Sequence, residues 1–158
     1  MQLDLNPPIG AGPLRFGMPI AEATELASVW GEARKAGPTR GRTAFKVLIV
    51  HPEFEIVLAA EDGKSLTAIE AWRFENDEAD VRVEFNGMDI FRTPARDLIQ
   101  RISEAGHESE IGDNEETIYP DLALALSRET SREVPLDPHD GLPLYVHYAL
   151  VAPSGYFD

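Results

Sequence analysis

Apolar residues recur with the spacing of an amphipathic helix in two separate parts of the chain. In residues 19–31, Pro19 suits a first helical turn and Gly31 suits the helix end. One face of this segment carries Ala23, Leu26, Ala27 and Trp30. The pattern therefore predicts a first helix that buries this face.

The second helical pattern covers residues 93–106. Thr93 can cap the helix, Pro94 fits its first position and Gly106 can end it. The apolar face of this segment carries Ala95, Leu98, Ile99 and Ile102. A second, better delimited helix is therefore predicted.

Strand patterns separate and follow the two helices. VRVEF at 81–85 alternates between apolar and charged residues, as a half-solvated strand does, and links the two parts of the chain. Asp62-Gly63 predicts a tight hairpin turn between two β-rich segments. The other predicted strands are 43–50, 54–60, 65–74, 116–120, 121–127 and 142–152.

The two halves of the chain correspond piece by piece. The segment 50–62 (VHPEFEIVLAAED) matches 118–130 (IYPDLALALSRET), with the proline aligned, and Asp62-Gly63 matches Asp140-Gly141. Gly17-Met18 likewise matches Gly87-Met88, and the helical quartets match in order. We interpret this as an old duplication, with repeat 1 at about 14–80 and repeat 2 at about 81–152 of a single domain, 1–158.

The predicted fold is α+β. Two diverged repeats, each a helix followed by antiparallel strands, share a mostly antiparallel sheet of six to eight strands, with the helices packed on one face. The other face is then either solvated or occupied. The second repeat carries a longer loop at 131–141, SREVPLDPHDG, which is too rich in Pro and Asp for a strand.

Composition narrows the classes of partner. The formal charge is −14, which disfavours nucleic acid and anionic membrane surfaces. Such acidity either steers a basic protein partner or simply maintains solubility, and the charge alone does not decide between the two. The chain has no cysteine, no visible secretion signal and no apolar stretch that would span a membrane, so we expect a cytoplasmic protein.

Residues 12–31, GPLRFGMPIAEATELASVWG, resemble the opening motif of a set of uncharacterised bacterial proteins. More distantly, Gly17-Met18 followed by a helix resembles the helix entry of the SmpA/OmlA and beta-lactamase-inhibitor-protein fold. The resemblance implies helices followed by antiparallel strands, duplicated in the inhibitor, and a habit of binding other proteins. This chain lacks the secretion signal and the cysteines of those exported proteins.

No motif of catalysis, metal binding or phosphate binding stands out, and no cofactor is predicted. The best polar cluster is Asp137, His139, Asp140 and His147, which meet only if the loop folds back on the last strand. Turn geometry explains the first three equally well. His51 and His107 fit packing and a helix end.

Aromatic residues alternate with charged ones along two predicted strands. Large rigid side chains on an open strand face anchor partners well, whereas in a closed fold the same residues form core. The candidate partner-binding residues are Trp72, Phe74, Asp137, His139, Asp140, Tyr145 and His147.

These observations favour a non-catalytic protein-binding protein, of which an immunity or inhibitor protein against a basic toxin enzyme is the most concrete form. The first alternative is a small-ligand binder or enzyme that uses the sheet face near His139 and His147. The second is a structural homodimer joined through the open sheet face.

Overall fold

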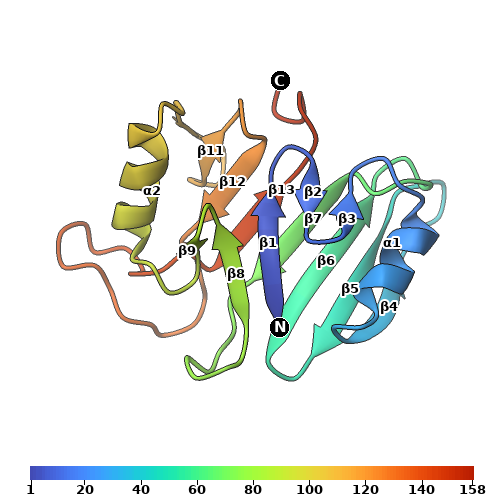
Figure 1. The fold of residues 1–158 in the computed structure, drawn as a ribbon, viewed down its shortest axis with the longest axis horizontal. Coiled ribbons are helices and arrows are strands. Elements are labelled where there is room, and N and C mark those ends of the chain that lie inside the picture. Colours follow the sequence, from blue (N-terminus) through green and yellow to red (C-terminus); the bar gives the residue numbers. More distant parts are fainter.

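The computed structural model describes residues 1–158 and contains a large antiparallel sheet of eight strands (Figure 1). The strand order is β10-β11-β12-β13-β7-β6-β5-β4. The bounds are β4 Glu32–Ala36, β5 Phe45–His51, β6 Phe54–Ala60, β7 Ala68–Trp72, β10 Glu110–Ile111, β11 Thr117–Tyr119, β12 Leu124–Ser127 and β13 Tyr148–Val151.

A smaller sheet of five strands has the order β3-β2-β1-β8-β9. Its strands are β1 Gln2–Asn6, β2 Gly10–Ala11, β3 Leu14–Arg15, β8 Arg82–Phe85 and β9 Met88–Asp89. The pairing of β1 with β8 is parallel, whereas all other strand pairs in the molecule are antiparallel.

Helix α1 (Ile20–Ala27) and helix α2 (Ala95–Glu104) lie on either side of the smaller sheet, on the same face of the large sheet (Figure 1). The α+β class, the mostly antiparallel sheet and the placement of both helices on one face are therefore confirmed. The longer helix has ten residues, and neither helix is long and apolar enough to cross a membrane.

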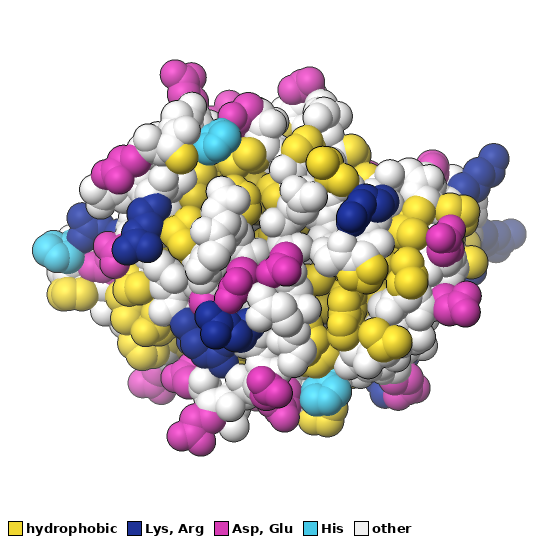
Figure 2. Space-filling model, viewed as in Figure 1, with side chains coloured by type: hydrophobic (Ala, Val, Ile, Leu, Met, Phe, Trp, Pro, Cys, Tyr) yellow, Lys and Arg dark blue, Asp and Glu magenta, His cyan; other side chains and the backbone are white.

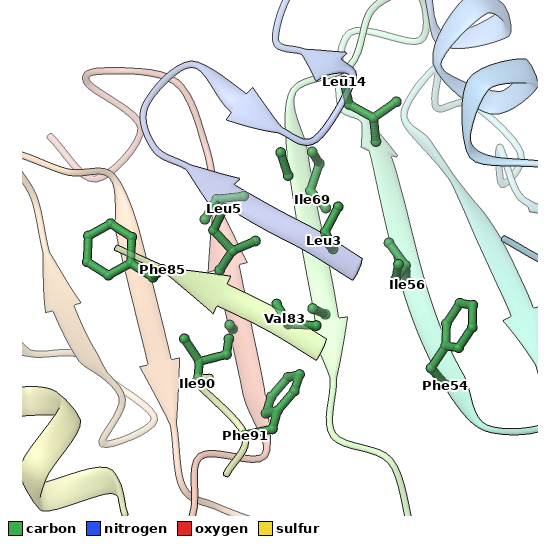
Figure 3. Packing of buried hydrophobic residues seen from close by; sticks show 14 of the residues in the cluster. Leu3, Leu5, Leu14, Phe54, Ile56, Ile69, Val83, Phe85, Ile90 and Phe91 are labelled. Atoms are coloured by element: carbon green, nitrogen blue, oxygen red, sulfur yellow. The ribbon is translucent and has the colours of Figure 1, made fainter. Parts of the chain in front are cut away.

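The core lies between the large sheet and the layer formed by the small sheet and the helices. Leu3 and Leu5 of β1 are buried and alternate with solvent-exposed neighbours, and Leu3 lies beside Ile69 of the large sheet (Figure 3). Val83 and Phe85 of β8 are also buried and alternate with less buried neighbours, as the predicted alternation of 81–85 required. These side chains belong to one cluster of 32 buried residues that spans both halves.

The two halves of the chain contain the same elements in the same order. Each contributes a strand of the central parallel pair, then a helix, then four strands that run from an edge to the centre of the sheet. The helices match by their prolines: Pro19 and Pro94 are the N-caps, and both bridge to the segment after an Asp-Gly turn. The duplication itself stays a prediction.

The structure aligns the residues of the two helices differently from the predicted alignment. The buried face is Ile20, Ala23 and Ala27 in α1, and Ala95, Leu98 and Ile102 in α2, so Ala23 pairs with Leu98 and not with Ala95. Spacing alone did not show this, because helical periodicity repeats every three or four residues.

Three local predictions need correction. Thr93 does not cap α2: the N-cap is Pro94, whose carbonyl accepts the first helical hydrogen bond, and no side chain caps the helix. Helix α1 ends at Ala27, four residues before Gly31. The Asp62-Gly63 turn lies within a longer connection, residues 61–67, between β6 and β7.

Candidate functional site

The face of the large sheet that points away from the helices, here called the outer face, carries its most distinctive side chains at the centre. Strand alternation directs Glu70 and Trp72 of β7 to this face, since Ile69 and Ala71 belong to the core. In the neighbouring β13, Tyr148 lies opposite Trp72 and Leu150 lies opposite Glu70. The register between these two strands therefore places four such side chains together.

A groove of about 600 Å³ opens over this part of the outer face. Three aromatic side chains and three glutamates line it together with hydroxyl, amide and apolar groups, and no Lys, Arg or His is among its lining residues. The aromatic and acidic members are Trp72, Tyr148, Phe157, Glu70, Glu116 and Glu129.

The Glu70 carboxylate is largely enclosed, with only 12% of its side chain exposed. Its Oε1 accepts a hydrogen bond from the Tyr148 hydroxyl at 3.0 Å and one from Lys46 Nζ at 3.3 Å. Burial and the negative charge of Glu70 raise the pKa of Tyr148. The tyrosine therefore stays protonated and remains a donor to Glu70.

Trp72 forms the exposed wall of the groove, with 42% of its surface accessible. Its ring centroid lies 4.7 Å from that of Tyr148, and the two rings are tilted by 60°. The large apolar area of this side chain gains free energy when a partner covers it.

The C-terminal segment closes one side of the groove. Tyr156 and Phe157 pack against a small apolar cluster formed by Ala59, Ala68, Ala123 and Ala152. The Tyr156 hydroxyl donates a 2.7 Å hydrogen bond to Glu61 Oε1, which fixes the segment across the strands. Phe157 thereby becomes part of the groove wall.

Of the seven residues predicted to bind a partner, Trp72 alone lines this groove. Phe74 is 2% exposed and packs edge to face against Phe91. The guanidinium groups of Arg73 and Arg92 lie over its ring, at 4.7 and 4.2 Å from the centroid. Phe74 is thus a core residue and no part of an exposed surface.

Tyr145 and His147 also lie away from the outer face. Tyr145 is half-buried beneath Arg73, whose guanidinium is 4.7 Å from the ring centroid. His147 is 4% exposed, and its Nδ1 lies 3.3 Å from Arg132 Nη2. Burial, together with the charges of Arg132 and Arg73, lowers the pKa of His147 to about 4, so the imidazole is neutral at neutral pH.

Both aspartates of the 131–141 loop are engaged within the fold. Asp140 pairs with Arg128 through both carboxylate oxygens, and the buried Asp137 accepts the backbone N–H of His139. No group of three or more His, Asp or Glu side chains is arranged to hold a metal ion. His139 is exposed, whereas His147 is buried.

Glu70 and Tyr148 were not predicted from the sequence, and neither were the other lining residues of the groove apart from Trp72. Tyr148 follows His147 and lies on the opposite side of the strand, and Glu70 stands two residues before Trp72. Glu70 could have been found from the alternation along 65–74, which places Glu70 and Trp72 on one face of the strand. The proximity of Tyr148 to Glu70 could not be predicted in this way, because it depends on the register between two strands whose paired residues are 78 positions apart.

Comparison of the chain with protein-family models, with curated proteins and with solved structures finds no match in any of the three. The resemblance of residues 12–31 to known proteins therefore stays a prediction.

Proposed function

We propose that this chain is a non-catalytic protein-binding protein that docks a basic partner on the outer face of its large sheet. The observation that carries the proposal is the groove itself. It combines an exposed tryptophan with two further aromatic rings and three glutamates, and it contains no cationic side chain. Exposed Trp and Tyr side chains are common anchors of protein-binding surfaces, and charge of one sign selects a partner of the opposite sign.

The overall charge supports a basic partner. At −14 the chain attracts positively charged proteins over distances comparable to the Debye length, which is about 10 Å at 0.1 M salt. The opposite face, with the helices and the small sheet, carries acidic and basic side chains interspersed with separate hydrophobic areas (Figure 2). That mixture favours the outer face as the docking surface.

The narrower form of the proposal is an immunity or inhibitor protein that neutralises a basic toxin enzyme. A protein of this kind needs a surface that covers a cationic active-site region and no chemistry of its own. Co-expression tests this form directly: the chain should relieve the toxicity of its partner, and a groove variant should not.

The broader proposal is tested by affinity capture from a lysate of the source organism at low salt. Three baits are compared. They are the wild-type chain, the double groove variant Trp72→Ala/Glu70→Gln, and the control variant Glu75→Gln, which changes an exposed residue that forms no ion pair. We expect one basic protein on the wild-type and control baits, released by salt and absent from the groove variant. Equal retention by all three baits would reject the groove as the docking site.

A further inference from the structure

The two oxygens of the Glu70 carboxylate are in different situations. Oε1 accepts hydrogen bonds from Tyr148 and Lys46, which occupy both of its lone pairs. Oε2 accepts no hydrogen bond from the protein, although Glu70 is largely enclosed by the groove. No buried side-chain oxygen of the structure lacks a hydrogen-bond partner, so Oε2 is open to solvent and can accept a donor that enters the groove.

The surroundings of this oxygen suit a cation. Trp72 and Tyr148 stand on the same face beside Glu70, and the faces of aromatic rings attract positive charge. Glu116 and Glu129 line the same groove and add negative potential. Lys46 is the nearest cation, and it lies on Oε1 from the β5 side, outside the residues that line the groove.

We propose that Glu70, Trp72 and Tyr148 form a subsite for one ammonium group, that of a lysine side chain on the basic partner. This rests on the proposed function for the identity of the partner, but the subsite exists without it. Lysine is favoured over arginine because a guanidinium pairs best with both oxygens of a carboxylate, and only one is free. An ammonium group is a compact charge that needs one oxygen, as Lys46 already shows at Oε1.

The subsite can be tested on the isolated chain by NMR. The two tryptophans give two indole N–H resonances, and that of Trp30, which lies outside the groove, serves as an internal control. The probe is Nα-acetyl-lysine methylamide, compared with the neutral norleucine analogue and the arginine analogue. We expect a saturable shift of the Trp72 resonance alone, with norleucine binding about tenfold more weakly and arginine binding more weakly than lysine.

Variants separate the groups involved. Glu70→Gln should weaken binding of the lysine probe about tenfold, whereas Glu75→Gln should leave it unchanged. Lys46→Met frees a lone pair of Oε1, so the arginine analogue should gain several-fold in affinity. An unshifted Trp72 resonance, equal binding of norleucine, or binding that survives Glu70→Gln would each overturn the subsite.

Failure of the subsite and failure of the proposed function are distinguishable. If a basic partner is captured through the groove while lysine does not bind at Glu70, the subsite is wrong and the proposed function stands. If lysine binds at Glu70 while no basic protein is retained, the subsite stands and the proposed function fails. The backbone amide spectrum of Glu70→Gln shows whether that variant keeps the fold.

Discussion

Tyr148 contributes to stability through its hydroxyl group, and a nearby tyrosine provides the comparison. Its hydroxyl has one acceptor, the enclosed Glu70, whereas the hydroxyl of Tyr145 makes no hydrogen bond within the chain. Tyr148→Phe should therefore lower the free energy of unfolding by about 1–2 kcal/mol, and Tyr145→Phe should change it by less than about 0.5 kcal/mol. Urea denaturation of both variants measures the difference, and equal stabilities would contradict the role assigned to the Tyr148 hydroxyl.

His147 makes stability depend on pH. Its pKa is lowered from 6.5 to about 4 in the folded chain, so below pH 6.5 the unfolded state binds a proton that the folded state does not. The stability that the neutral imidazole contributes is therefore full above pH 6.5 and is lost as the pH falls toward 4. The loss across this window is about 3 kcal/mol.

The comparison of wild type with His147→Gln, which keeps an acceptor for Arg132, isolates this contribution. Urea unfolding between pH 4 and pH 7 should show a shallower pH dependence in the variant. His139→Gln is the matched control, because the side chain of His139 is exposed. If the pH profiles of wild type and His147→Gln coincide, His147 does not titrate as described.

At the scale of elements, strand β1 shows how a short segment holds the two halves together. Leu3 is fully buried between the small sheet and the large sheet (Figure 3), so Leu3→Ala should lower the free energy of unfolding by about 2–5 kcal/mol. Leu136→Ala, at a 57% exposed leucine, should cost much less. Thermal and urea unfolding check both, and a small effect at Leu3 would show that β1 is dispensable.

The elements that could be predicted from the sequence are those whose apolar pattern is complete within one segment. Strand β6 has the predicted bounds, 54–60, and β8 shows the expected alternation. Strand β1 was missed although Leu3 and Leu5 alternate in the same way, because five residues at a chain end give a weak signal. Strand β4 has no buried residue and forms only through pairing with β5, so its sequence carries no strand pattern.

The candidate site was harder to predict than the fold for a related reason. Trp72 could be singled out as an aromatic residue in a strand, but which face it occupies depends on the layer that covers the other face. That layer is the β1–β8 pair, which joins residues about 80 positions apart. The proximity of Tyr148 to Trp72 likewise follows from pairing between two distant strands, and no short turn sets that register.

At the scale of the whole molecule, the charge opposes self-association through the outer face. A two-fold dimer would bring the groove of one copy against that of another, so glutamates would face glutamates across a desolvated interface. We therefore expect a monomer of 17.5 kDa by size exclusion with light scattering at both low and high salt. A stable dimer that Trp72→Ala abolishes would instead favour the homodimer alternative.

Salt should have opposite effects on folding and on partner binding. With a charge of −14 the folded chain repels itself, and screening reduces this repulsion more in the compact state than in the expanded one. The melting temperature should therefore rise when NaCl is increased from about 20 mM to about 300 mM, whereas capture of the basic partner weakens over the same range.

The double variant Glu75→Gln/Glu78→Gln removes two exposed charges. Its melting temperature should be higher than that of the wild type at low salt and nearly the same as that of the wild type at high salt. A melting temperature that falls with salt would mean that attractive ion pairs, such as those of Arg128 with Asp140, outweigh the net repulsion.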